Sequence, residues 1–226
     1  MDYKDLMSRL TGLSAVSGHE KATALHISEE FKEYCDKVEI DKFYNVIGIK
    51  KGTGDKRKKI MVAAHMDETG FMVKSIDEKG FIRVTNIGGM DSRVLPAQEV
   101  VIHGKRDVHG VFGAKPPQLM EPDEEKKALK LKDLYIDTGL DVTEVKEIVS
   151  IGDTITFVNH PMELKGGNFS SKSVDNRCGT AALIGAMKEL SDVRHESDVY
   201  FVCTVQEEVR LTGAITASYN LSPDAA

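Results

Sequence analysis

Residues 59–68 read KIMVAAHMDE, and the interpretation of the fold is built around this stretch. Its apolar residues, Ile60 to Ala64, form a continuous run of strand length, which is typical of a strand covered on both faces of a sheet. A histidine and two acids follow where that strand should end. The active sites of open parallel sheets lie at or just beyond the carboxyl ends of their strands. The stretch therefore predicts a buried strand with a polar site at its end.

The segments around this strand complete an α/β pattern. Two apolar stripes at helical spacing occupy the first forty residues, and Ser17-Gly18 interrupts them. Further elements are expected as extended pieces at 37–50, a helix at 175–190, a second apolar strand at 199–205 and another helix from 213. Alternating strands and helices with buried strands predict a doubly wound, largely parallel sheet.

Between about Gly70 and Pro161 the pattern changes to short β-like runs separated by Gly and Asp turns. The runs are 71–76, 80–84, 99–103, 107–112 and 153–158. Evenly spaced short strands predict a small β-barrel inserted at residues 70–161 into a parent domain of residues 1–69 and 162–226. Inside the barrel, residues 115–132 are polar, proline-broken and charged, which favours a loop that is mobile or ordered only against another subunit.

The composition excludes a nucleic-acid partner. The 226 residues carry a formal net charge of −6, and 29% of them are charged, with both signs interspersed. A nucleic-acid surface needs a clustered basic face. The one basic cluster, residues 50–59 (KKGTGDKRKK), contains two glycines between apolar segments and is expected to be a solvated hairpin or loop.

The sequence also predicts a cytoplasmic protein without membrane contact. No segment approaches the roughly 18 consecutive apolar residues of a membrane span. The N-terminus (MDYKDLMSRL) begins with acids and lacks the apolar core of a signal peptide. Cys35, Cys178 and Cys203 each have apolar neighbours, which indicates buried free thiols in a reducing compartment.

The first candidate site segment is His65-Met66-Asp67-Glu68. In an extended chain, residues i and i+2 share a face. Asp67 could therefore accept a proton from one imidazole nitrogen of His65 while the other nitrogen binds a metal ion. The alternative is a structural histidine that caps a buried strand.

The second segment is Ser173-Val174-Asp175-Asn176-Arg177, at the start of the long helix. Here Ser or Asp could act as an N-cap and accept the first amide protons of the helix. The functional interpretation instead makes Asp175 a carboxylate that bridges two cations.

The third segment, Gln206-Glu207-Glu208, directly follows the apolar strand at 199–205. Solvent exposure at a strand end would explain two adjacent acids. Alternatively, because neighbours on a strand point in opposite directions, one glutamate could bind a metal while the other holds a proton for an attacking water.

Together the three segments supply imidazole and carboxylate ligands without a thiolate. This donor set suits Zn, Co or Mn and does not choose among them. A dinuclear site, with ions roughly 3.5–4 Å apart, needs such a bridging carboxylate and a base beside it.

These motifs resemble those of the tetrahedral, dodecameric di-metal aminopeptidases, whose members are called glutamyl aminopeptidase or, in error, endoglucanase. The matching runs are residues 63–68, residues 173–177 with Gly179, and residues 206–209. Residues 17–20 (SGHE), Gly88-Gly89 and residues 113–117 (GAKPP) resemble the family in the same order.

The resemblance implies a role for each residue. His65 would bind one metal ion, Asp175 would bridge both, and Glu208 would bind the second. Glu207 would be the general base, and Asp67 would orient His65. Two divalent ions (zinc or cobalt, with manganese possible) and short peptides with a free N-terminus would be the cofactors and substrates. The barrel would drive dimerisation, and dimers would assemble into a homo-oligomer of twelve subunits.

Some features depart from the family pattern. Members run to about 350 residues, the size of a two-domain chain, and supply a further aspartate and histidine ligand. Both ligands are expected beyond Ala226, so the chain is expected to be truncated and its metal affinity reduced. Arg210 stands where a glycine is expected, and Gln118 where a histidine is expected.

Several alternatives stay open. The chain could be a catalytically inactive fragment, or an oligomerisation or peptide-binding protein on the same fold. A deacylase or carboxypeptidase would use the same metals. A cysteine hydrolase could be built on Cys178, and a glycosidase on paired carboxylates. The remaining histidines are expected to be structural or exposed, with a metal site at His103 and His109 as the alternative.

Overall fold

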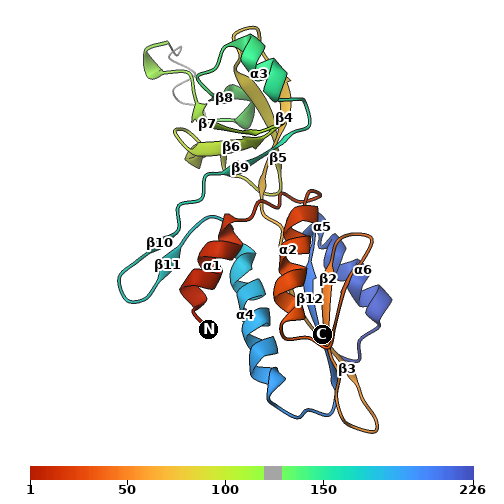
Figure 1. Ribbon diagram of the computed structural model, residues 1–226. Helices are drawn as coiled ribbons and strands as arrows, with labels where there is room; N and C mark the ends of the chain where they lie inside the picture. Colours follow the sequence, from red (N-terminus) through yellow and green to blue (C-terminus); the bar gives the residue numbers. More distant parts are fainter. Residues whose placement is uncertain (120–128) are drawn as a thin grey trace. The chain divides into compact units, whose positions relative to one another are not determined.

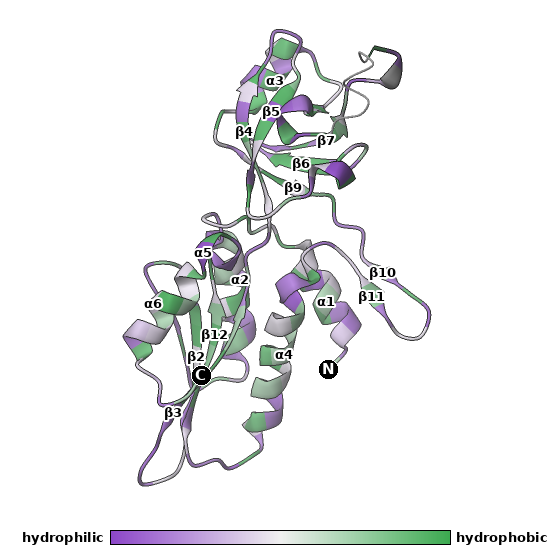
Figure 2. Cartoon of the chain, turned by 180° about the vertical axis from the view of Figure 1, so that it is seen from behind, coloured by the Kyte–Doolittle hydropathy of each residue, from purple (hydrophilic) through white to green (hydrophobic). Residues whose placement is uncertain are grey.

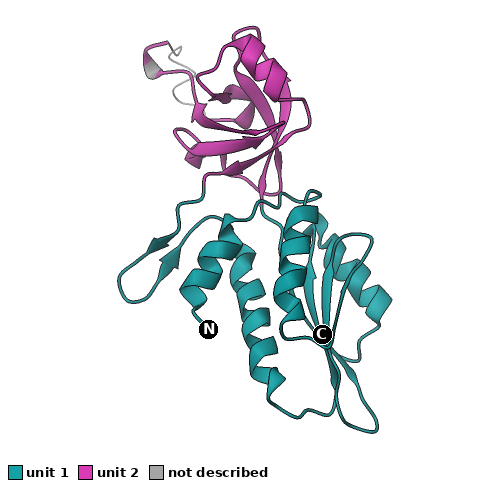
Figure 3. Ribbon diagram, viewed as in Figure 1, with its two compact units in different colours: residues 1–68, 159–226 teal, residues 69–158 magenta. Residues whose placement is uncertain are grey.

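The computed structural model describes residues 1–119 and 129–226. The chain divides into two compact units, coloured separately in Figure 3: unit 1 comprises residues 1–68 and 159–226, and unit 2 comprises residues 69–158. The second boundary lies before Asn159 rather than at the predicted residue 162, because the segment that leads into the β10–β11 hairpin belongs to unit 1. Among the described residues, no helix combines the length and apolar character needed to cross a membrane.

Unit 1 contains a four-stranded sheet with helices on both faces (Figure 1). Its helices are α1 (Tyr3–Gly12), α2 (Lys21–Lys32), α4 (Val174–Ser191), α5 (Glu207–Arg210) and α6 (Thr212–Leu221). Its strands are β1 (Lys37–Ile40), β2 (Val46–Lys50), β3 (Lys59–His65), β10 (Met162–Glu163), β11 (Phe169–Ser170) and β12 (Asp198–Thr204).

The sheet has the order β1-β2-β12-β3 and is mixed, so these strands do not form the predicted largely parallel sheet, and the doubly wound arrangement stays a prediction. Only β12 and β3 run parallel; β1 with β2 and β2 with β12 run antiparallel. The short connection at residues 41–45 makes β1 and β2 a hairpin, and a hairpin joins antiparallel strands, whereas parallel strands need a long crossover.

Alternating residues of the central strands pack into two separate clusters. Phe201 and Cys203 of β12 pack with α1, α2 and α4 on one face, whereas Val202 packs towards α6 on the other. The strands β2 and β12 carry mostly hydrophobic residues (Figure 2). Burial of a side chain such as Phe201 contributes about 1.5–3 kcal/mol.

Strand β3 lies at the edge of this sheet and is less covered than its apolar run predicts. Val62 keeps 41% of its surface exposed. In the described chain, the free edge of β3 is paired only by the parallel bridge between Ile60 and Ala225. An apolar run is equally consistent with a central strand and with this edge strand, because strand order depends on distant segments.

Unit 2 is a closed barrel of the order β4-β5-β8-β7-β6-β9, which confirms the predicted small barrel. Its strands are β4 (Gly70–Ile76), β5 (Ile82–Ile87), β6 (Glu99–His103), β7 (Asp107–Gly113), β8 (Tyr135–Asp137) and β9 (Thr154–Phe157). The rings of Phe71 and Phe112 meet edge to face in its core, with centroids 5.0 Å apart.

Two elements of unit 2 are absent from the sequence prediction, strand β8 and helix α3 (Val142–Ile148). The helix carries a recognisable signal, since Asp141 and Glu144 form a capping box. Of the segment 115–132, predicted to be a loop, the described parts include the short 3-10 turns Pro117–Leu119 and Leu131–Asp133. Residues 120–128 lie outside the described residues.

Candidate metal centre

The three polar segments meet at one end of the unit 1 sheet. His65 is the last residue of β3 and is paired in register with Thr204, the last residue of β12. Because these two strands are parallel, their carboxyl ends lie side by side, which brings His65 next to the turn that contains Glu207 and Glu208. Asp175 reaches the same place from the start of α4.

His65 is the centre of the cluster. Its Nε2 atom lies 3.1 Å from Oδ1 of Asp175 and 3.8 Å from Oε2 of Glu207. His65, Glu207 and Glu208 each offer one ligand atom, and these atoms all lie within 4.8 Å of one another. One imidazole nitrogen and several carboxylates form a donor set that fits first-row divalent metals. The residues present therefore fit a metal ion.

The electrostatics of the cluster favour a cation. Burial lowers the pKa of the His65 imidazole, but the carboxylates of Asp67, Asp175 and Glu207 outweigh it and raise that pKa to about 9. Burial and the neighbouring carboxylates raise the pKa of Glu208, with His65 opposing them. A bound metal ion would relieve the repulsion among these carboxylates.

Asp67, predicted to orient His65, contacts both the imidazole and the turn that follows β12. Its carboxylate is wholly buried, and its Oδ1 atom lies 3.4 Å from Nδ1 of His65. The Ser17 hydroxyl donates to this carboxylate at 2.6 Å, and the backbone amides of Glu207 and Glu208 donate at 3.0 and 3.1 Å. Burial would raise the pKa of Asp67, but hydrogen bonds from His65, Ser17 and these amides lower it below its usual value.

Glu207 and Glu208 do not lie on a strand, so the predicted alternation of their side chains is wrong. Strand β12 ends at Thr204, Gln206 adopts a left-handed conformation with φ of 52°, and Glu207 begins the single-turn helix α5. Successive residues of a helix differ by about 100° rather than 180°. Both carboxylates can therefore join His65 in one group.

The buried carboxyl of Glu20 holds the same turn from the other side. It accepts the amide protons of Gln206 at 3.0 Å and of Gly18 at 2.8 Å. Ser17 and Glu20 belong to the SGHE segment that the sequence singled out only by resemblance, without a role. The structure makes this segment a support for the Glu207-Glu208 turn.

Asp175 is not the cap of α4, and neither is Ser173. Ser173 makes no capping hydrogen bond, and Asp175 and Asn176 have non-helical backbone angles. Asn176 is the cap, because its Oδ1 atom accepts the amide proton of Gly179 at 3.0 Å. The side chain of Asp175 is 87% exposed and faces His65 instead.

In the described part of the chain, the cysteines and His103, the alternative candidates from the sequence, lack the surroundings of a catalytic or metal-binding group. Cys178 is exposed, so the prediction of buried thiols is wrong for it, whereas Cys203 is buried and Cys35 half-buried. The Cys178 thiol donates to Oδ1 of Asn176 at 3.7 Å, and an amide oxygen cannot serve as a general base. His103 contacts Asp107 and Thr156 through its two ring nitrogens, each at 2.9 Å, which indicates a structural role.

The two departures from the family pattern cause no backbone strain where they stand. Arg210 is exposed in the right-handed α5, and the left-handed position falls on Leu211 with φ of 58°. Gln118 is exposed in unit 2.

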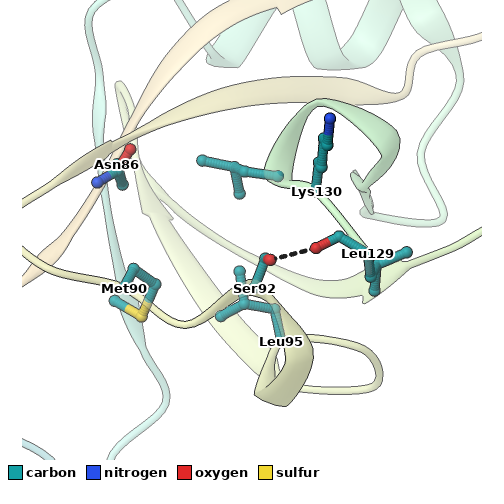
Figure 4. A pocket seen from close by; sticks show the side chains of 7 residues that line it. Asn86, Met90, Ser92, Leu95, Leu129 and Lys130 are labelled. Atoms are coloured by element: carbon teal, nitrogen blue, oxygen red, sulfur yellow. Dashed lines mark hydrogen bonds between the residues drawn. The ribbon is translucent and has the colours of Figure 1, made fainter. Parts of the chain in front are cut away.

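Unit 2 contains a separate hollow of about 260 Å³ (Figure 4). Its lining residues are Asn86, Met90, Ser92, Leu95, Leu129, Lys130 and Leu131. The Ser92 hydroxyl donates to the Leu129 carbonyl at 2.5 Å. This lining contains neither imidazole nor carboxylate, so the hollow lacks the groups found in the unit 1 cluster.

Comparison with known proteins agrees with this geometry. The family model of the M42 glutamyl aminopeptidases matches residues 45–226, and the chain therefore belongs to that family. It is 34% identical to the lysyl aminopeptidase of Pyrococcus furiosus over 97% of this chain and 64% of that protein.

Solved structures of aminopeptidases share the fold. A TET aminopeptidase from a marine-sediment thaumarchaeon matches with a TM-score of 0.93 and 35% identity, over 100% of this chain and 65% of that chain. The TET1 peptidase of Pyrococcus horikoshii, described as able to form a tetrahedron or a large octahedral shell, matches with a TM-score of 0.87 and 33% identity, over 99% and 67%. The chain thus spans less than two thirds of the length of the first curated relatives it matches.

Proposed function

We propose that this chain carries the metal centre of an aminopeptidase that hydrolyses the N-terminal residue of short peptides. One observation supports this most: His65, Asp175, Glu207 and Glu208 converge at the carboxyl ends of two parallel strands in a member of an aminopeptidase family. The residues proposed for the metal centre all belong to unit 1.

In the proposed centre, His65, Asp175 and Glu208 would hold two divalent ions, zinc or cobalt with manganese possible, and Asp175 would serve both ions. When bound, such ions polarise the scissile carbonyl and lower the pKa of a nearby water. A further aspartate and histidine ligand stay predictions from the resemblance. Asp67 orients His65.

Glu207 is the proposed general base. Its side chain is 35% exposed, so water and substrate can reach it, while the Asp67 carboxylate holds its backbone amide. Glu207 would take a proton from the attacking water and return it to the leaving amine. We infer that the free α-amine of the peptide is held within the same acidic cluster, so that an N-acetylated peptide is refused.

We further propose that the barrel drives dimerisation and that dimers assemble into a dodecamer. This proposed assembly is supported by the similarity to TET peptidases, one of which is described as able to form a tetrahedron or a large octahedral shell. The unpaired cysteines are in keeping with a reducing, cytoplasmic location, which is also part of this proposal.

The test is amino-acid release from a peptide with a free N-terminus and from its N-acetylated form, with zinc or cobalt added. Release from the free peptide alone, abolished in Glu207→Gln with metal binding retained, supports the proposal. Release from the acetylated peptide with a free C-terminus would support a deacylase or carboxypeptidase instead.

If neither peptide is cleaved, the same assay on a chimera distinguishes an incomplete metal centre from a non-enzymatic protein. The chimera joins the part of the Pyrococcus furiosus relative that lies beyond the matched region to this chain. Activity in the chimera means that the 226 residues hold an incomplete centre. Inactivity in a folded, metal-binding chimera would contradict the proposed function and favour a non-enzymatic protein on this fold.

A further inference from the structure

Glu68 and Lys172 form a buried ion pair beside the cluster, and neither has a role in the function proposed above. Their side chains are 5% and 8% exposed, and Nζ of Lys172 lies 2.8 Å from Oε2 and 3.0 Å from Oε1 of Glu68. Glu68 directly follows Asp67, and Lys172 precedes Asp175 by three residues.

The pair joins three segments of unit 1. The Ala15 amide donates to Oε1 of Glu68 at 3.0 Å, and Lys172 donates to the Leu13 carbonyl at 3.3 Å. The Ser173 hydroxyl donates to Oε2 of Glu68 in a short hydrogen bond. The loop after α1, the end of β3 and the approach to α4 are therefore tied to one carboxylate.

Ser173 needs such support because its backbone is left-handed, with φ of 56°. This conformation is unfavourable for a residue with a Cβ atom. Its hydroxyl is held by Glu68, and its carbonyl accepts the Arg177 amide proton at 3.1 Å. Asp175 lies between Ser173 and Arg177 in the chain, and its Oδ1 atom is 3.1 Å from Nε2 of His65.

A buried ion pair is a weak source of stability, because the desolvation of two charges offsets most of their attraction. The pair instead supplies hydrogen bonds that fix Ala15, Leu13 and Ser173 relative to one another. The neighbouring buried guanidinium of Arg177 also anchors the end of α1, donating to the Leu10 carbonyl at 2.5 Å and the Leu13 carbonyl at 3.3 Å. Both cations thus hold the same backbone.

We propose that Glu68 is a positioning residue of the metal centre: paired with Lys172, it fixes Ser173 and thereby places Asp175 opposite His65. The inference rests on the proposed function. It predicts that the pair matters for metal affinity separately from its effect on folding, because loss of outer hydrogen bonds around a metal centre typically weakens metal binding about 10–100-fold.

The test compares Co²⁺ binding by the full chain, followed by calorimetry and by the visible spectrum of the bound ion, with thermal unfolding of the same variants. Glu68→Gln should weaken Co²⁺ binding at least tenfold and alter the spectrum. Glu30→Gln is the matched control, because Glu30 also pairs with a basic side chain, that of Arg9, but lies on α2 with 18% of its side chain exposed. It should bind within twofold of the unsubstituted chain.

A double variant separates positioning from stability. In Glu68→Leu with Lys172→Met no unpaired buried charge and no acceptor for the Ser173 hydroxyl is left, so thermal stability should recover, whereas Co²⁺ affinity should stay low because Ser173 is released. Affinity that recovers together with stability would overturn the inference. If Glu68→Gln does not fold, Ser173→Ala decides, since it removes the hydroxyl link and keeps the ion pair; unchanged affinity there would overturn the inference.

Failure of the inference differs from failure of the proposed function. If His65→Ala loses Co²⁺ binding while folded Glu68→Gln binds normally, only the positioning role is wrong. If His65→Ala binds Co²⁺ as the unsubstituted chain does, the proposed centre itself is wrong.

Discussion

The carboxylate of Asp67 accepts the backbone amide proton of Glu207 at 3.0 Å. The same buried group accepts the Glu208 amide and the Ser17 hydroxyl and lies beside the imidazole of His65. One anion therefore fixes the end of β3 relative to the turn after β12. The proposed ligands His65, at the end of β3, and Glu208, in the turn after β12, therefore both depend on Asp67.

Asp67→Asn should weaken both folding and metal binding. An asparagine offers one oxygen where the carboxylate has two, and its amide group would face backbone donors. We expect a loss of about 2 kcal/mol in the free energy of unfolding of the metal-free chain and about 10–100-fold weaker Co²⁺ binding. Urea denaturation and calorimetry measure these effects. Asp5→Asn, at an exposed position of α1, should stay within about 0.5 kcal/mol; an equally mild Asp67→Asn would contradict the structure.

Asn176→Ala should destabilise unit 1 through loss of the α4 cap. Removing an N-cap side chain costs about 0.5–2 kcal/mol. Asn176→Asp keeps an acceptor oxygen for the Gly179 amide and should lose much less. Urea unfolding of both variants makes the comparison. Equal stability of the alanine and aspartate variants would show that Asn176 is not the cap.

The metal-free chain should lose stability as the pH rises through the His65 transition. The folded-state pKa of His65 is raised from 6.5 to about 9. Protonation therefore favours the fold: its contribution is fully present below pH 6.5 and lost as the pH rises through about 9. The shift corresponds to roughly 3 kcal/mol.

Unfolding free energies measured in chelator across this range should fall in the unsubstituted chain and fall less in His65→Gln. His26→Gln, on the exposed side of α2, should keep the original slope. A slope that is the same in all three chains would contradict the assigned environment of His65.

The left-handed residue of the α5–α6 junction should tolerate glycine where the neighbouring Arg210 does not. Leu211 has φ of 58° and is 50% exposed. Leu211→Gly should be about 1 kcal/mol more stable than Leu211→Ala. Arg210→Gly, which introduces the residue expected from the family, should cost about 0.5–1 kcal/mol because Arg210 is helical. Thermal unfolding that reverses this order would place the left-handed residue elsewhere.

One thiol should react rapidly in the native chain. Cys178 is exposed, whereas burial raises the pKa of Cys35 to about 11 and that of Cys203 to about 12. A thiol-reactive chromophore at pH 8 should modify one cysteine quickly and the others only on unfolding. Cys178→Ser should remove the fast phase. A second fast thiol would contradict the burial of Cys35 and Cys203.

Much of the fold could be predicted from local pattern. Three kinds of element show their hydrophobic pattern within a few consecutive residues. They are the apolar run before His65, the helix that begins near residue 174 and the short strands of the barrel. The inserted barrel is confirmed, apart from β8 and α3. The antiparallel pairing of β2 with β12 could not be predicted, because a buried strand has the same apolar pattern whether its neighbour runs parallel or antiparallel.

The candidate site, like the fold, combines features that are local in the sequence with features that depend on the folded chain. The residue types that follow the ends of β3 and β12 could be read from the sequence, since polar groups at strand ends are local features. The folded arrangement was needed to establish that Asn176 rather than Asp175 caps α4, that Glu207 and Glu208 share a helical turn, and that Glu68 pairs with Lys172. These outcomes depend on register, backbone angles and contacts between residues more than a hundred positions apart in the case of Glu68 and Lys172, and local periodicity carries no information about such contacts.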